Sequence, residues 1–337
     1  MPFFTKVMWK LVSVVILFSL FSCKEKGFEL QGETQGTTYY IKYFANKSLV
    51  EKAEIDSILH QFDLSLSTYI PNSIISKINR DEAIEVDDFF VENFKISQKV
   101  YHDTDGLFDP TIGVLVNAYG FGPSKQSIEW KENSLDSLLQ LVGFDKIRLN
   151  ERRIAKKHYS MYFDFNAVAQ GYAVDVLVAH LKSKGIKNAL VEIGGEIFTF
   201  GQNKESNKPW TTGIDDPLQN PEEGRKLIAK LAQTDLGLAT SGNYRKIKTD
   251  SVTGQKFVHI IHPKTGLATK TSILSATILA KTTAEADAYA TATMLMEPKQ
   301  MMEFYNQRPQ LLAFVVYEEN GKIIIYESEG LKAIKSP

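Results

Sequence analysis

The stretch that most constrains this chain is residues 281–296, KTTAEADAYATATMLM, because it carries a start signal for a helix. Thr282 and Glu285 have the spacing of a capping box, in which the hydroxyl and the carboxylate bind amides that a first helical turn leaves without partners. Alanine recurs at alternate positions and is the residue that favours a helix most strongly. We therefore predict a helix that begins near Thr283.

This predicted helix carries two oxygen-bearing side chains on one face. Asp287 and Thr291 are four residues apart, so they lie about one turn from each other on the same side. A carboxylate and a hydroxyl so placed suit a hard divalent cation, and Mg2+ is the obvious candidate because it takes few protein oxygens. The small alanines around the pair predict a bare surface. The alternative, a solvated surface acid beside a tolerated threonine, is the commoner arrangement for such a pair taken alone.

The first residues indicate export and a lipid anchor. Lys6 and Lys10 precede an apolar run over residues 11–22, which is too short to span a bilayer comfortably and is typical of a secretory signal. Cys23, the only cysteine, follows directly and together with residues 20–22 resembles the lipobox of bacterial lipoproteins. It would then be the acylated first residue of the mature protein. An uncleaved membrane anchor with an incidental cysteine is the alternative.

The remaining length suits one large folded domain. We assign residues 1–22 to a signal peptide, 23–32 to the lipidated cysteine and a polar spacer, and 33–337 to the domain. The formal net charge of −1 gives no support to nucleic-acid binding.

Strands and helices follow each other without regular alternation, which favours an α+β fold. Strands are expected at 37–44, 146–149, 153–165, 189–193, 196–200, 213–215, 226–231, 236–240, 257–261, 275–279, 312–317 and 322–326, and further helices around 55–62, 90–101, 135–141, 168–184 and 301–305.

Glycine-containing clusters punctuate the predicted strand ends, where backbone amides become free to meet a ligand. Each cluster alone is more often a structural turn. None has the spacing of a dinucleotide-binding or P-loop motif, and no zinc-protease or serine-hydrolase motif is present. The clusters cover residues 106–113 with 119–122, 166–175, 192–196, and 239–244 with 259–266.

Two histidines stand close together in the last cluster. His259 and His262 are three residues apart, so in a strand they point to opposite faces and do not bind one metal. One histidine would then be a buried structural residue and the other a functional residue. Ser241 has no paired base in the sequence that would make it a nucleophile.

In this order and spacing, eight pieces resemble the ApbE family of bacterial flavin transferases, which are often lipoproteins. The resemblance covers nearly all of the mature chain. It implies a single α+β domain of mixed, mainly antiparallel sheets, with a cleft for FAD between two α/β portions. The pieces are GTTYYIKY at Gly36, STYIPNSIISKIN at Ser67, GLFDPTIGVLVNAYGFG at Gly106, AQGYAVD at Ala169, EIGGEI at Glu192, ATSGNY at Ala239, HIIHPKTG at His259 and EADAYATA at Glu285.

The resemblance also implies roles for particular residues. Mg2+ would be held by Asp287, by Thr291 and by a backbone carbonyl, that of Ala169. Tyr69 would stack on the flavin, whose flat ring system suits an aromatic face. His259 would lie near the pyrophosphate and accept the proton of the target threonine. The implied FAD-binding set is Tyr39, Tyr69, Asp109, Thr111, Gln170, Gly171, Asp175, Glu196, Ser241 and His259, and the implied catalytic residues are His259 and Asp287.

The implied reaction is Mg2+-dependent transfer of FMN from FAD to a threonine of an acceptor protein, with release of AMP. The acceptor would be a membrane redox subunit, and the lipid anchor would hold the enzyme outside the cytoplasm, on the periplasmic side of the inner membrane. Two alternatives remain: hydrolysis of FAD to FMN and AMP, and an FAD-binding lipoprotein without chemistry. Gln170 stands where the family commonly has lysine and His262 where it commonly has aspartate, so phosphate and loop contacts can differ here.

Overall fold

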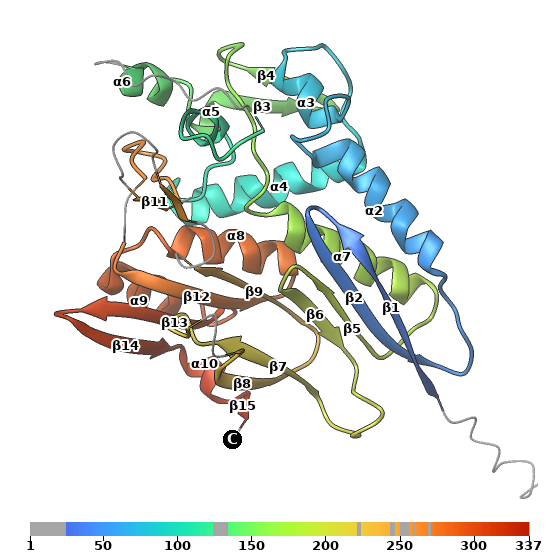
Figure 1. The fold of residues 1–337 in the computed structure, drawn as a ribbon. Helices are drawn as coiled ribbons and strands as arrows, with labels where there is room; N and C mark the ends of the chain where they lie inside the picture. The colour runs from blue at the N-terminus through green and yellow to red at the C-terminus, as the bar shows by residue number, and fades with distance from the viewer. Residues whose placement is uncertain are drawn as a thin grey trace, which may run out of the picture.

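The computed structural model describes residues 25–123, 134–220, 224–242, 247–249, 256–258, 260–268 and 271–336. Within these residues the centre of the molecule is an eight-stranded sheet in which every paired neighbour is antiparallel (Figure 1). In spatial order its strands are β1 (Lys26–Thr34), β2 (Thr37–Ala45), β5 (Ala189–Ile193), β6 (Glu196–Phe200), β9 (Leu236–Gly242), β12 (Ile273–Ala280), β13 (Leu312–Glu319) and β14 (Lys322–Glu327).

Helices cover one face of this sheet. α7 (Ala169–Ser183) packs on β5 and β6, and α8 (Thr283–Thr293) packs on β9 and β12. α2 (Lys52–Leu66) lies against α7, and α4 (Asp88–Asp103) lies against α8, so the helices form two layers over the sheet (Figure 1). α9 (Pro298–Asn306) packs on β13. The largest hydrophobic core lies between the sheet and these helices.

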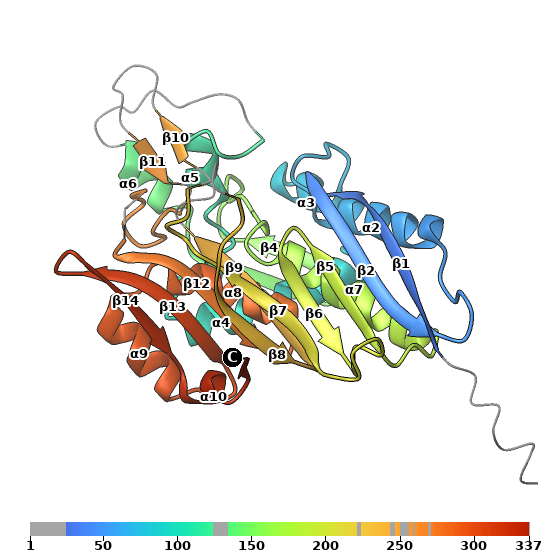
Figure 2. The same cartoon turned by 60° about the horizontal axis from the view of Figure 1, so that its bottom comes forward.

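A smaller sheet covers part of the opposite face. In the described part of the chain it has three strands, β15 (Lys335–Ser336), β8 (Leu227–Gln233) and β7 (Trp210–Asp215), and α10 (Glu329–Lys332) lies beside it (Figure 2). Leu231 of this sheet and Leu238, Leu279 and Phe314 of the large sheet share a second core. The central strands β9, β12 and β13 are therefore covered on both faces.

A third group of short elements lies beyond α4, away from the large sheet (Figure 1). Leu115, Val142 and Ile261 form a small core there, which joins this group to the segment after β11. The elements are α3 (Ile74–Asn79), α5 (Gly113–Ala118), α6 (Ser134–Leu139), the 3-10 helix Phe144–Lys146, β3 (Ile147–Asn150) and β4 (Arg153–Lys156). The short pair β10 (Ile247–Thr249) and β11 (Lys256–Val258) lies beside α5 and α6 (Figure 2).

The start of α8 is confirmed, although only half of the capping box forms. The helix begins at Thr283, and the Thr282 hydroxyl accepts a hydrogen bond from the amide of Glu285 at 3.2 Å. The Glu285 carboxylate pairs with Lys99 of α4 instead of reaching back to the cap. This carboxylate therefore joins two helices.

The segment 23–32 is not a spacer throughout, because β1 begins at Lys26 and pairs with β2 along its whole length. Its apolar Phe28 and Leu30 alternate with polar residues, which is the pattern of a strand with one covered face. The strand expected at 153–165 ends at Lys156. The Ser73 hydroxyl caps the first turn of α3 by accepting from the Ser76 amide at 3.2 Å.

The signal-peptide residues 1–22 and Cys23 lie outside the described residues. Among the residues that are described, none of the helices combines the length and the apolar character that crossing a membrane requires.

Candidate functional site

Helix α8 is enclosed on most sides by other elements, and Glu285 and Thr291 are its partly exposed residues. Its five alanines, at positions 284, 286, 288, 290 and 292, are each 0% exposed. They therefore do not form a bare surface for a ligand, as the sequence suggested; they let α4, α7, β9 and β12 approach the helix closely. Asp287 is only 7% exposed, so the alternative of a solvated surface acid is wrong. A buried carboxylate needs partners that stabilise its charge.

Two glycines bring neighbouring backbones against the first turn of α8. A Cβ added to Gly171 of α7 would lie 2.7 Å from the carbonyl carbon of Thr283, and a Cβ added to Gly237 of β9 would lie 2.7 Å from the carbonyl carbon of Thr282. Both contacts are with backbone atoms, which cannot rotate away as a side chain does. The glycines therefore fix how closely α7 and β9 approach α8.

The two oxygen-bearing residues of α8 face these same neighbours. The amide of Gly171, in the first turn of α7, donates to Oδ2 of Asp287 at 3.2 Å. The hydroxyl of Thr291 lies 3.4 Å from that of Ser241, near the end of β9. Asp287, Thr291 and Ser241 thus place carboxylate and hydroxyl oxygens between α7, α8 and β9. In the described residues no group of three His, Cys, Asp or Glu side chains is arranged to hold a metal, so a cation here depends on this oxygen set.

Asp175, predicted to line a nucleotide pocket, binds the start of α8. Its Oδ1 accepts from the amide of Thr283 at 2.8 Å and its Oδ2 from the amide of Ala284 at 2.9 Å. Burial raises the pKa of Asp175 to about 6, against the lowering effect of these amides. Both oxygens are engaged by protein, and this differs from the role that the resemblance implied.

The glycine turn between β5 and β6 lies beside the start of α7. A Cβ on Gly194 would be 3.2 Å from Nε2 of Gln170 and 3.4 Å from Oε2 of Glu196, which is 5% exposed. The Gly194 amide donates to the carbonyl of Thr38 in β2 at 3.1 Å. The structure therefore brings Gln170 and Glu196 together with the GTTYYIKY segment. Ala169, whose carbonyl was the expected third metal ligand, is the first residue of α7.

The two predicted aromatic contacts lie in different environments. Tyr69 follows α2 and is 59% exposed, and its hydroxyl donates to the carbonyl of Phe121 at 3.4 Å. Tyr39 is 1% exposed, and its hydroxyl donates to Asp56 of α2 at 2.6 Å. Tyr69 thus presents an open ring, whereas Tyr39 is part of the core and offers no open face to a flavin.

Asp109 and Thr111 connect the loop before α5 to the turn at Gly143, before the 3-10 helix. The amide and the hydroxyl of Thr111 donate to Oδ1 of Asp109 at 2.8 and 2.6 Å, and the Thr111 hydroxyl accepts from the Gly143 amide at 2.7 Å. Thr111 is 0% exposed, and the single proton of its hydroxyl is donated to Asp109.

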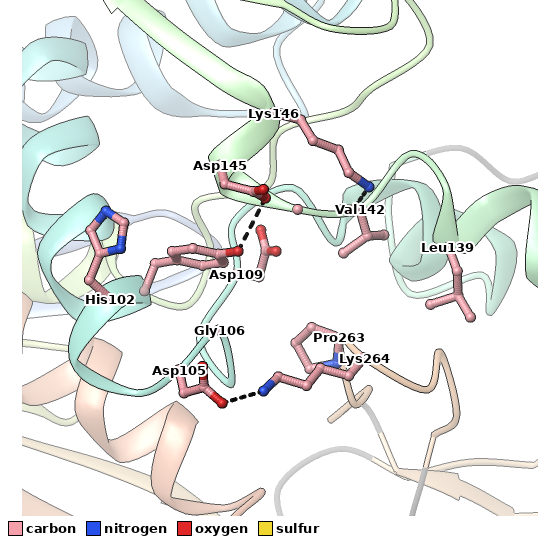
Figure 3. A pocket seen from close by; sticks show the side chains of 12 residues that line it. His102, Asp105, Gly106, Asp109, Leu139, Val142, Asp145, Lys146, Pro263 and Lys264 are labelled. Atoms are coloured by element: carbon pink, nitrogen blue, oxygen red, sulfur yellow. Dashed lines mark hydrogen bonds and ion pairs between the residues drawn. The ribbon is translucent and has the colours of Figure 1, made fainter.

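Asp109 lines a cavity of about 360 Å³ between the end of α4 and the loop after Ile261 (Figure 3). Tyr101 donates to Asp145 there at 3.3 Å, and Lys264 pairs with Asp105 at 2.6 Å. Tyr101 and Asp145 lie outside every glycine cluster, so no motif distinguishes them from ordinary surface residues, whereas Lys264 lies within the HIIHPKTG piece but had no role assigned to it. The full lining is Tyr101, His102, Asp105, Gly106, Asp109, Leu139, Val142, Gly143, Asp145, Lys146, Pro263 and Lys264.

Asp109 should make stability depend on pH. Burial raises its pKa from 3.8 to about 6, so the folded state binds its proton more tightly than the unfolded chain does. This contribution is therefore complete below pH 3.8 and is lost as pH rises through about 6. Relative to Asp109→Asn, the wild type should lose about 1.4 kcal/mol between pH 5 and 7.5. Urea unfolding of both proteins at the two pH values tests this, and an unchanged difference would contradict it.

The last histidine pair is only partly described. Nδ1 of His262 accepts from the Lys264 amide at 3.1 Å, and burial, together with the charge of Lys264, lowers the pKa of His262. A neutral His262 thus holds the turn that follows it. His259, the predicted proton acceptor, lies outside the described residues.

The fold and the site together define an α+β protein in which carboxylate and hydroxyl oxygens gather between two helices and the central sheet. Residues 35–315 match the model of the ApbE family. The chain therefore belongs to the ApbE family.

Proteins named FAD:protein FMN transferase are similar to this chain over almost their whole length. The one from Haemophilus influenzae is 30% identical over 334 residues, which is 94% of each chain. The one from Vibrio cholerae is 31% identical over 323 residues, covering 92% of this chain and 94% of the relative.

Solved structures confirm the predicted fold class of mixed helices and antiparallel sheet. The flavin transferase ApbE from Vibrio cholerae has a TM-score of 0.80 at 29% identity, covering 92% of this chain and 99% of that one. The apo form of the Pseudomonas stutzeri flavinyl transferase ApbE also has a TM-score of 0.80, at 27% identity, covering 92% and 97%.

Proposed function

We propose that this chain transfers FMN from FAD to a threonine hydroxyl of an acceptor protein and releases AMP. The threonine oxygen bonds to the FMN-side phosphorus, the bond from that phosphorus to the AMP oxygen breaks, and the hydroxyl proton passes to a base. The observation that carries the proposal is the oxygen set of Asp287, Thr291 and Ser241 in a chain matched over 92–94% of its length by FAD:protein FMN transferases. Such a reaction depends mainly on positioning and charge stabilisation.

The residues at this site fit Mg2+. Asp287 supplies a buried carboxylate and Thr291 a hydroxyl one turn away, and hard oxygen donors of this kind are what Mg2+ takes from proteins. Asp287 and Thr291 would hold the ion, with the Ala169 carbonyl from the start of α7. When bound, the ion supplies positive charge against the pyrophosphate oxygens of FAD.

The surrounding residues suit the rest of FAD. The exposed ring of Tyr69 offers a face on which an isoalloxazine ring can stack. Gln170 replaces the cation common in the family with an amide, so a phosphate here would receive hydrogen bonds in place of an ion pair. Glu196 and Ser241 border the same region from β6 and β9.

We assign the proton acceptor to His259, whose imidazole suits general-base chemistry near neutral pH. His259→Asn should lower the rate of FMN transfer at least about a hundredfold, because an amide does not accept the hydroxyl proton. Transfer is measured as flavin fluorescence on the acceptor after denaturing electrophoresis. A His259→Asn rate equal to that of the wild type would remove His259 as the base, whereas a control variant of an exposed histidine of α2, His60→Asn, should leave the rate unchanged.

One assay separates transfer from hydrolysis and from simple binding. The protein is incubated with FAD and Mg2+, with and without an acceptor domain that carries a short Ser/Thr-containing motif. AMP release and protein-bound flavin are followed by mass. AMP that appears only with the acceptor supports the transferase, AMP without acceptor supports an FAD pyrophosphatase, and no AMP in either case supports an FAD-binding lipoprotein.

The proposed site of action of the enzyme is the membrane surface. An acyl chain on Cys23 would tether the enzyme to the periplasmic side of the inner membrane, where a membrane redox subunit is a suitable acceptor. β1 begins three residues after this cysteine, so the tether to the folded domain would be short.

A further inference from the structure

A carboxylate of each of the helices α7 and α8 accepts hydrogen bonds from amides in the first turn of the other helix. Asp175 of α7 binds the amides of Thr283 and Ala284 at the start of α8. In return, Asp287 of α8 binds the amide of Gly171 at the start of α7. Amides of a first turn have no partner within their own helix, and negative charge is favourable there. Each helix therefore depends on a carboxylate of the other.

Strand β9 fixes the same helix at two further points. Gly237 meets the backbone at Thr283, and Ser241 meets Thr291. Four strand residues advance about 13 Å and eight helical residues about 12 Å, so the strand and the helix keep in step between these points. The glycine contacts limit how closely α8 can approach its neighbours. The bonds to Asp175 are directed along the axis of α8, so they limit sliding.

We infer that Asp175 is a positioning residue for the metal-holding pair: by binding the first amides of α8, it holds Asp287 against the start of α7 and Thr291 beside Ser241 of β9. The inference rests on the proposed function only through the assignment of the metal to that pair. Asp175 acts through α8, since each of its carboxylate oxygens already binds an amide of that helix.

The chemistry of the carboxylate explains why this position takes aspartate. Two amides 2.8 and 2.9 Å from separate oxygens need two acceptors on one side chain. An asparagine offers one acceptor and would turn its NH2 group toward the second amide. The two donors would repel each other and loosen the start of α8, although the asparagine side chain has nearly the same volume as aspartate. Residues that hold a metal ligand in place typically change affinity by about 10- to 100-fold when replaced.

The test measures Mg2+ binding to the full-length, detergent-solubilised protein by isothermal titration calorimetry, without FAD or acceptor. We expect Asp175→Asn to raise the dissociation constant of Mg2+ at least about tenfold. Thr282→Ala is the matched control: it removes the other cap of α8, the bond to the Glu285 amide, and leaves the bonds to α7 intact. It should lower the melting temperature and leave the dissociation constant within about twofold of wild type, as expected for a cap that affects only helix stability.

Three results would overturn the inference. The first is unchanged Mg2+ affinity in Asp175→Asn, and the second is an equal loss in Thr282→Ala, which would tie affinity to helix stability alone. The third is no Mg2+ binding by the wild type, and the separate AMP assay would still decide whether FMN is transferred. If Asp175→Asn does not fold, Asp175→Glu takes its place, because it keeps the charge and displaces both oxygens by one methylene. Weaker binding by Asp175→Glu supports the inference, and unchanged binding contradicts it.

Discussion

Asp287→Ala should lower the rate of FMN transfer at least about a thousandfold, which corresponds to about 4 kcal/mol of transition-state stabilisation. The variant removes the only carboxylate of the oxygen set and leaves the Gly171 amide without its acceptor. Covalent flavin on the acceptor, followed by fluorescence at saturating FAD and Mg2+, measures the effect.

Two further variants show whether the loss in Asp287→Ala comes from the missing charge at this site. Asp287→Asn keeps the shape and one acceptor oxygen but loses the charge, so it should be nearly as slow as Asp287→Ala if charge on the metal is what matters. Glu303→Ala removes an exposed acid of the neighbouring helix α9 and should transfer at the wild-type rate. Normal transfer by Asp287→Ala would remove the metal assignment.

Gly171→Ala and Gly237→Ala should each lower the free energy of unfolding by about 2 kcal/mol. In each variant a methyl group would stand 2.7 Å from a backbone carbon at the start of α8, so α8 or its neighbour must move. Alanine favours a helix over glycine by up to about 1 kcal/mol, which opposes the loss at Gly171 without cancelling it. Urea unfolding monitored by circular dichroism gives the change.

Gly27→Ala is the matched control for this pair. Its added Cβ would lie 3.4 Å from Phe44 and Glu205, which is ordinary contact. Stability within about 0.5 kcal/mol of wild type is expected there, as for most substitutions at sites without strain. If Gly171→Ala were as stable as this control, α8 would not be held as tightly as the structure implies.

Features set by neighbouring residues were predictable from the sequence. Thr282 marked the start of α8. Asn320 and Gly321, which stand between the expected strands 312–317 and 322–326, are a residue pair typical of a tight hairpin turn, and both have positive φ angles there, of 53° and 73°. A cap and a two-residue turn involve only a few consecutive residues, so their residue types determine them.

Features that depend on distant parts of the chain were not predictable from spacing. Asp175 finds its partners 108 and 109 residues away, and the motif around it gave no sign of them. The alanines of α8 look like an exposed helical face in isolation, and only the elements packed around the helix show that they are buried. The Tyr39 ring was likewise assigned to a ligand, although its neighbour in space, Asp56, makes it part of the core.

The long span of chain between α7 and α8 should make the contact between these two helices slow to form. The contact from Gly171 to Asp287 closes 116 residues, and β9, which pairs with β12, lies between them in sequence. Contacts of such long range form slowly, because the loop must close before the contact is made. A chain shorter than residue 291 has no complete site, so the oxygen set assembles only when nearly the whole chain is available to fold.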